Sequence, residues 1–145
     1  MSDDDPHNRN LEFLITEVAR LITREYDRRV RDLNLTRSQW RVLVYLIRSD
    51  GVNQTELAEL LDIGKVALGD LLDRLESKGW VERRPDLQDR RAKRVYLTDE
   101  VRPLIIEMTE RARVMHRQLT RGMAKEDQER FVAMLQDAKA NLAAG

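Results

Sequence analysis

The 145-residue sequence contains no cysteine, only two histidines, and few aromatic residues, which make up 5% of the chain. The absence of cysteine excludes a disulfide-stapled scaffold, a zinc ribbon, a cysteine nucleophile and a sensor based on thiol oxidation. His7 and His116 are too few for most structural zinc sites. We therefore expect no metal site and no cofactor, and we interpret His116 as a helix-surface or interface residue.

The sequence also lacks a long apolar run and an excess of either charge. No stretch approaches the roughly 18 apolar residues of a membrane span, and residues 1–9 are acidic and polar, unlike a signal peptide. We interpret residues 1–9 as a disordered leader, and the protein as soluble and cytoplasmic with no membrane partner. Lysines and arginines number 26, as do aspartates and glutamates, so the formal net charge is +0. This neutrality argues against a non-specific polycation but permits a local basic surface.

Helical periodicity dominates the first half of the chain. Apolar residues from Leu11 to Leu33 recur at helical spacing and predict one long helix. TRSQ at 36–39 has the pattern of a capping box and opens a second helix, which we expect to end near Gly51. NQTE at 53–56 is a similar pattern and opens a third helix.

A helix-turn-helix followed by a hairpin is predicted next. DIG at 62–64 breaks the third helix, and a fourth helix ends at Gly79. Short segments at 80–84 and 93–97 flank a polar loop and alternate as half-buried strands do. This order is typical of a winged helix-turn-helix. We expect Thr98 to cap the next helix, with Pro103 in its first turn, and a last helix from Glu126 after an interruption at Gly122.

The predicted hairpin concentrates positive charge in a neutral chain. Between residues 83 and 94, six cations face Asp86 and Asp89, a local net charge of +4. An arginine at a hairpin tip suits the narrow minor groove of DNA. We expect Asp89 to pair with Arg91 and stiffen the loop, leaving Arg90 to enter the groove. The cations assigned to DNA on this hairpin are Arg83, Arg84, Arg90, Arg91, Lys93 and Arg94, with Arg83 and Arg94 on phosphates.

These segments resemble the MarR family of winged-helix regulators, and more closely its SlyA branch. The resemblance rests on DRRAKRVYLT (89–98) and LLDRLESKGWVERR (71–84), and more weakly on LNLTRSQWRVL (33–43), QTELAELLDI (54–63) and VRPLIIEM (101–108). It implies a mainly α (α+β) fold and a homodimer that binds a pseudo-palindromic operator in double-stranded DNA, most often as a repressor. It also implies helical dimerisation segments at 10–34 and 99–145, and a winged helix-turn-helix domain at 35–98.

The resemblance further implies a recognition helix that enters the major groove. Its candidate DNA-binding residues are Lys65, Val66, Ala67, Gly69, Asp70 and Arg74. Asp70 departs from the arginine that members of this branch often carry, and it would repel phosphate, although it could accept a hydrogen bond from cytosine. We therefore expect the wing, which is the predicted hairpin at 80–97, and its phosphate contacts to supply more of the affinity for DNA than in relatives.

Many members of the family bind small phenolic or carboxylate compounds, which implies a small-molecule effector. Candidate residues for such a cleft are Arg20, Tyr26 and Trp40, although Trp40 also fits the core. An enzyme is not expected, because no serine motif accompanies the histidines and no Gly-Lys-Ser/Thr follows Gly64 and Gly69. The alternative hypothesis is a dimeric helical module whose winged lobes bind protein, which Asp70 and the zero net charge favour.

Overall fold

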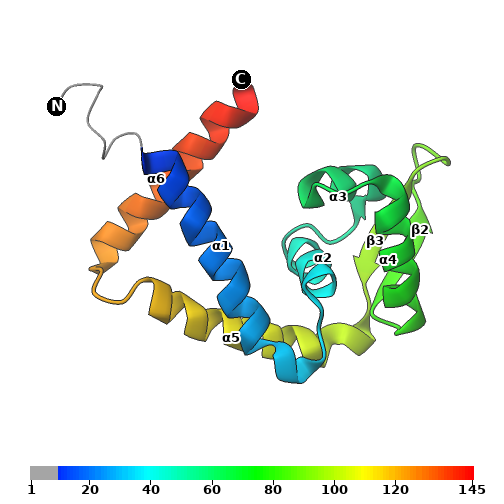
Figure 1. Ribbon diagram of the computed structural model, residues 1–145. Helices are drawn as coiled ribbons and strands as arrows, with labels where there is room; N and C mark the ends of the chain where they lie inside the picture. Colours follow the sequence, from blue (N-terminus) through cyan, green and yellow to red (C-terminus); the bar gives the residue numbers. More distant parts are fainter. Residues whose placement is uncertain (1–9) are drawn as a thin grey trace. The chain divides into compact units, whose positions relative to one another are not determined.

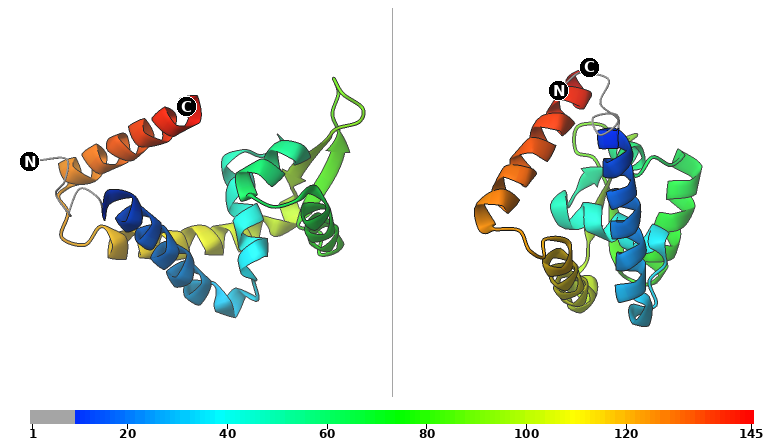
Figure 2. Two further views of the ribbon diagram at one scale, coloured as in Figure 1. Left: turned by 45° about the horizontal axis from the view of Figure 1, so that its top comes forward. Right: turned by 60° about the vertical axis from the view of Figure 1, so that its left-hand side comes forward.

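A computed structural model describes residues 10–145, and the predicted leader and His7 lie outside this range. The chain forms two compact units that divide between Ala112 and Arg113, inside one helix, and each unit is described by itself. Figures 1 and 2 show the elements of each unit.

The first unit begins with α1 (Leu11–Arg29) and a 3₁₀ turn, η2 (Arg31–Leu33). The prediction of one continuous helix to Leu33 is therefore wrong at its end. Asn34 follows with φ 57°, a left-handed conformation that stops helical propagation and that asparagine tolerates. The predicted capping box is confirmed: the Thr36 hydroxyl accepts the Gln39 backbone N–H and the Gln39 side chain accepts that of Thr36, both at 3.2 Å.

Three helices build the lobe: α2 (Arg37–Arg48), α3 (Gln54–Leu61) and α4 (Lys65–Ser77). The Asn53 side chain caps α3 by accepting the Thr55 backbone N–H at 2.8 Å, which confirms the predicted helix start. Asp62, with φ 58°, makes the tight turn between α3 and α4. The core between these helices is aliphatic and comprises Leu43, Leu46, Leu57, Leu68, Leu72 and Leu75, all fully buried.

A three-stranded antiparallel sheet completes the lobe, in the order β1-β3-β2. The predicted hairpin is confirmed as β2 (Val81–Pro85) and β3 (Lys93–Leu97), in the register Val81↔Leu97 to Pro85↔Lys93. The third strand, β1 (Val52–Asn53), pairs with the other edge of β3 and was not predicted, because two residues are too short to show a period. In Figures 1 and 2 the β2–β3 loop projects from the end of the sheet.

The hairpin leads through η3 (Asp99–Val101) into α5 (Arg102–Leu119), with Pro103 in the first turn as predicted. The prediction that Thr98 caps this helix is wrong. The Thr98 hydroxyl donates instead to the Gly79 carbonyl at 2.5 Å, and the Thr98 backbone N–H donates to the Trp80 carbonyl at 3.2 Å. Thr98 therefore ties the end of β3 to the turn after α4.

The second unit contains the end of α5 and α6 (Lys125–Ala144). Gly122, with φ 84°, makes the predicted interruption between the two helices. No residue of α6 is buried. Its most exposed large apolar side chains are Phe131, Val132, Met134, Leu135 and Leu142.

Candidate nucleic-acid interface

The predicted recognition helix, α4, buries one face in the lobe and presents the other to solvent. Leu68, Leu72 and Leu75 form the inward face and are fully buried. Of the predicted DNA-binding residues on this helix, Gly69 is half-buried, and the exposed ones are Lys65, Val66, Ala67, Asp70 and Arg74. The predicted set therefore lies where a groove could reach it.

The loop of the hairpin, residues 86–92, is organised around the buried carboxylate of Asp86. This carboxylate accepts the backbone N–H groups of Gln88 and Asp89 at 2.8 and 3.3 Å, and the Arg94 Nε at 2.8 Å. The bond from Gln88 chiefly holds the pKa of Asp86 below its ordinary value; burial opposes this, and the Asp89 amide and Arg94 reinforce it. A charged carboxylate thus fixes the loop from within.

Asp89 stiffens the loop in a different way from that predicted. Its carboxylate accepts the backbone N–H of Arg91 at 3.0 Å, and its carbonyl accepts that of Ala92 at 3.0 Å. The predicted ion pair between the Asp89 carboxylate and the Arg91 guanidinium is therefore wrong. Both Arg90 and Arg91 are exposed and make no ion pair within residues 10–145.

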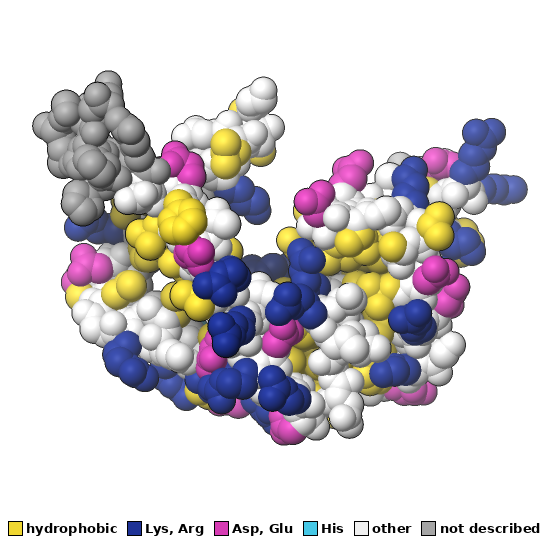
Figure 3. All heavy atoms as spheres, in the orientation of Figure 1, with side chains coloured by type: hydrophobic (Ala, Val, Ile, Leu, Met, Phe, Trp, Pro, Cys, Tyr) yellow, Lys and Arg dark blue, Asp and Glu magenta, His cyan; other side chains and the backbone are white. Residues whose placement is uncertain are grey.

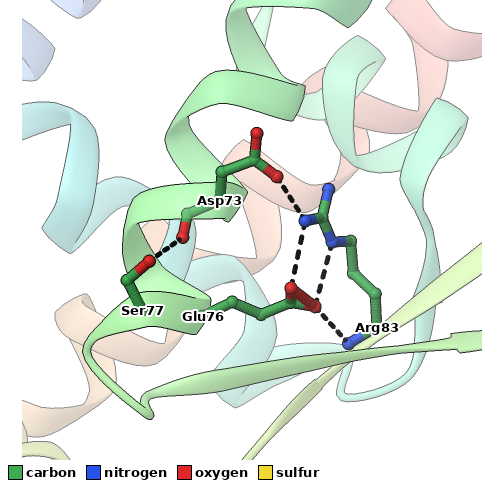
Figure 4. A network of polar contacts seen from close by, with 4 residues as sticks. All are labelled: Asp73, Glu76, Ser77 and Arg83. Atoms are coloured by element: carbon green, nitrogen blue, oxygen red, sulfur yellow. Dashed lines mark hydrogen bonds and ion pairs between the residues drawn. The ribbon is translucent and has the colours of Figure 1, made fainter.

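Arg83 is held by the helix rather than turned toward solvent. Its guanidinium donates to Glu76 through two hydrogen bonds of 3.0 Å and also to Asp73, as Figure 4 shows. The backbone N–H of Arg83 donates to Glu76 as well, at 3.1 Å. These bonds raise the pKa of Arg83 and, against the effect of burial, lower that of Glu76. A phosphate would have to compete with two carboxylates for this guanidinium.

Two further arginines of the hairpin have internal partners. Arg94 bridges Asp86 and the Gly51 carbonyl, the latter at 2.9 Å, and so joins the hairpin to the start of β1. Arg84 pairs with Glu82 at 3.1 Å and lies 4.5 Å from the centre of the Tyr96 ring. The prediction that Arg83 and Arg94 contact phosphates stays a prediction, and a phosphate would have to compete with the carboxylates that already pair with both arginines.

The remaining cations gather beside α4. Lys65, Arg91 and Lys93 line a hollow of about 430 Å³ together with Gln54, Thr55, Arg83 and Ala92. None of these three cations makes an ion pair with a residue that the structure describes. In Figure 3, lysine and arginine side chains stand out at the end of the lobe where Figure 1 places the β2–β3 loop. Arg90 is exposed next to Arg91 in the same loop, so Lys65, Arg90, Arg91 and Lys93 form a cationic edge that could hold an anionic backbone.

The residues predicted for an effector cleft separate into core and surface. Tyr26 and Trp40 are buried against each other, edge to face, with ring centres 4.7 Å apart. The Trp40 Nε1 donates to Asp27 at 2.6 Å and the Tyr26 hydroxyl to the Met108 carbonyl at 3.1 Å. Arg20 borders a hollow of about 450 Å³, together with Thr16, Ala19, Thr23, Arg24 and Arg37.

Sequence reasoning misses the acidic residues that organise the interface. Asp73, Glu76 and Asp86 look like ordinary surface charges in the sequence, although each bonds an arginine of the hairpin. The spacing of Glu76 and Arg83 across Gly79 is a usable signal, because a chain that reverses there brings the two together.

Neither a metal-ligand cluster nor a membrane-crossing helix is present in the described part of the chain. Residues 10–145 contain no group of three histidine, cysteine, aspartate or glutamate side chains that could hold a metal ion. No helix among them is long and apolar enough to cross a membrane. His116 is exposed on α5.

A helix-turn-helix backed by a three-stranded sheet defines a winged-helix protein. Residues 33–92 match the sequence model of the MarR family. The crystal structure of transcriptional regulator PA3341 is 32% identical, with a TM-score of 0.82, over 92% of this chain and 98% of that one. The chain belongs to the MarR family and has the fold of its transcription regulators.

Two structures of E. coli MarR are also similar to this chain. The apo form of the wild type is 27% identical, with a TM-score of 0.73, over 88% of this chain and 95% of that one. A mutant of the same protein, complexed with operator DNA, is 28% identical, with a TM-score of 0.73, over 94% of this chain and 99% of that one. The second of these is a relative solved on its operator.

Proposed function

We propose that the protein is a homodimeric, sequence-specific DNA-binding regulator, most readily a repressor, and not an enzyme. The observation that carries this proposal is the cationic edge formed by Lys65, Arg90, Arg91 and Lys93 beside the outward face of α4. In an otherwise neutral chain, internal carboxylates neutralise the other hairpin arginines, whereas these four cations remain available to phosphates. The relative solved on operator DNA supports the same use of the fold.

In this proposal α4 enters the major groove and the loop tip reaches the minor groove. Arg90 and Arg91, at the tip, are the arginines placed to enter the narrow groove. Arg84 and Arg74 add weaker contacts to the DNA backbone. The Arg84 side chain is still 56% exposed despite its ion pair with Glu82. Arg83 and Arg94 act through the shape of the hairpin rather than on phosphate.

A second copy of the chain would supply the other half of a pseudo-palindromic site. The exposed apolar side chains of α6, and separately those at the start of α1 such as Phe13 and Leu14, suit a dimer. We assign dimerisation to residues 10–34 and 99–145, DNA binding to residues 35–98, and the chain to the neighbourhood of the SlyA branch on its DRRAKRVYLT wing. The hollow beside Arg20, Arg24 and Arg37 suits the carboxylate of a small effector whose binding releases DNA.

A gel-shift titration tests the proposal directly. The probe is the DNA upstream of the protein's own gene, since regulators of this family often control their own promoters, with random DNA as competitor. A discrete complex that survives competitor supports specific regulation, and footprinting then gives the operator. Absence of any complex at low salt would instead favour a winged lobe that binds protein, an alternative that the carboxylates of Asp70 and Asp73 on α4 favour.

Salt dependence separates the two functions. DNA binding releases counterions and must weaken steeply between low and physiological salt, with a slope set by the number of phosphates neutralised. A protein-binding lobe whose contacts are apolar would show a shallow dependence. Arg102→Ala removes an exposed arginine at the start of α5. It is the matched control for substitutions of the hairpin arginines, because it tests the effect of losing one positive charge alone.

A further inference from the structure

The outward face of α4 opens with an apolar side chain. Val66 is 80% exposed, more than any other large apolar residue in a helix of the described first unit. It belongs to the first turn of α4, the part of a recognition helix that contacts base edges in helix-turn-helix proteins. An exposed valine stabilises no core, so its side chain is available to a ligand.

Val66 and Asp70 lie one helical turn apart on the side of α4 opposite Leu68 and Leu72. Neither side chain can donate a hydrogen bond, and the Asp70 carboxylate has no hydrogen-bond or ion-pair partner among residues 10–145. The cations that suit phosphates lie to one side, in the hollow lined by Lys65, Arg91 and Lys93. The groove-facing centre of α4 is therefore apolar and hydrogen-bond accepting.

Base edges in the major groove differ in what such a surface can read. The thymine 5-methyl is the apolar group on the floor of that groove, and the amino groups of cytosine and adenine are its donors. Guanine presents two acceptors there, which an arginine or lysine reads and a carboxylate repels. The chemistry of Val66 and Asp70 thus matches thymine and amino-bearing bases.

We propose that Val66 reads the 5-methyl group of a thymine in each half-site, with Asp70 accepting from the amino group of a neighbouring cytosine or adenine. This inference rests on the proposed DNA-binding function and specifies the class of sequence it selects. The operator of this protein then carries a thymine where an arginine at the start of this helix would select guanine.

Uracil substitution tests the inference, because uracil pairs as thymine does but lacks the methyl group. A library of random duplexes is enriched on the full-length protein, and the selected pool is amplified in parallel with dTTP or dUTP. We expect the uracil pool to bind about fourfold more weakly for each half-site, the effect of one lost methyl contact. Sequencing of the pool should show a shared thymine in both half-sites.

Two variants separate a contact at Val66 from a general effect of uracil on the duplex. Val66→Ser should bind the thymine and uracil pools more nearly alike than the parent does, since it replaces the two γ-methyl groups by a hydroxyl, and its exposed position leaves the fold intact. Leu87→Ala removes a fully exposed apolar side chain from the hairpin loop and should keep the parent's preference for thymine. Thermal unfolding of each variant checks the fold.

The outcomes are distinguishable. Equal binding of both pools by the parent, or the parent's full thymine preference in Val66→Ser, overturns the contact with the methyl group and leaves specific DNA binding standing. A library that yields no enriched sequence overturns the proposed function itself, and this inference with it.

Discussion

Arg83 on β2 and Glu76 on α4 are joined three times, by two hydrogen bonds of 3.0 Å from the guanidinium and one of 3.1 Å from the backbone N–H. A single helical carboxylate therefore fixes both the side chain and the main chain of a strand residue. The contact sets the angle between hairpin and helix, the two elements that would have to enter adjacent grooves. Under the proposed function, Arg83 acts as a positioning residue, because its guanidinium is already bound by Glu76.

Glu76→Gln should lower the free energy of unfolding by about 1 kcal/mol at neutral pH, a modest value because both groups still touch solvent. Arg83 holds the pKa of Glu76 below its ordinary value, so this stabilisation is complete above the pKa of an unfolded glutamate, about 4.3, and is lost as the pH falls through the lower folded pKa. Urea unfolding of parent and variant at neutral pH and at a series of acidic pH values below about 4.3 measures the difference, which should shrink steadily as the pH falls. Glu82→Gln, which loses only an exposed pair with Arg84, is the control.

Arg90→Ala and Arg91→Ala should each weaken operator binding about tenfold or more without changing the unfolding midpoint, because both side chains are exposed and unpaired within the described chain. A substitution that removes a phosphate contact should also reduce the slope of the logarithm of the binding constant against the logarithm of salt concentration by about 1 for each half-site. Fluorescence anisotropy at several salt concentrations measures both quantities. Parent-like binding by both variants would show that the loop tip does not contact DNA.

Asp86→Asn should weaken operator binding more than Asp89→Asn does. The buried Asp86 carboxylate accepts hydrogen bonds from two backbone N–H groups and from Arg94. The exposed Asp89 carboxylate accepts only one among the described residues, from the backbone N–H of Arg91. Hydrogen exchange of the loop amides should rise in Asp86→Asn, which links the lost affinity to loss of loop order. The reverse ranking would mean that Asp89 has a direct part in the complex.

Asp70→Arg should bind DNA more tightly and less selectively, because it exchanges a repelled carboxylate for a cation on the outward face of α4. The measurement is the ratio of affinities for operator and random duplexes, taken at low and physiological salt. Unchanged affinity at every salt concentration would place Asp70 away from the duplex.

Tyr26→Phe should cost about 1 kcal/mol at neutral pH by removing the hydrogen bond to the Met108 carbonyl. Burial raises the pKa of Tyr26 to about 12. Since an unfolded tyrosine ionises at about pH 10, the stability tied to the neutral hydroxyl is present below that pH and is lost as the pH rises toward 12. Unfolding of parent and variant at neutral and alkaline pH gives the comparison. Tyr45→Phe, whose hydroxyl has no hydrogen-bond partner in the described chain, is the control.

The helices, turns and strands that are specified by short local sequence patterns were predictable from the sequence. The Thr36 capping box, the Asp62 turn and the paired strands on either side of residues 86–92 all follow from rules that act over a few residues. The family also followed, because its wing motif lies within one continuous stretch.

What sequence could not predict depends on contacts between distant residues. Arg94 looks like any other cation of the basic run until folding brings it to Asp86 and the Gly51 carbonyl. Trp40 could equally have lined a cleft, and its burial follows from Tyr26 and Asp27 on another helix. Local charge counts therefore overstated how many arginines the hairpin presents to a ligand.

The two-residue strand β1 makes β3 the central strand of a sheet instead of half of an isolated ribbon, which would be marginally stable in water. Around it, the Gly51 backbone N–H donates to the Val95 carbonyl at 2.8 Å and the Asp50 carboxylate accepts the Leu97 N–H at 2.8 Å. The wing is thus an assembly of the hairpin and the 50–53 segment, and the hydrogen bond between Asp50 and Leu97 joins residues 47 positions apart in sequence. A chimaera that takes its wing from a relative must also take that relative's counterpart of the 50–53 segment. A hairpin transferred alone would lack the strand that stabilises it.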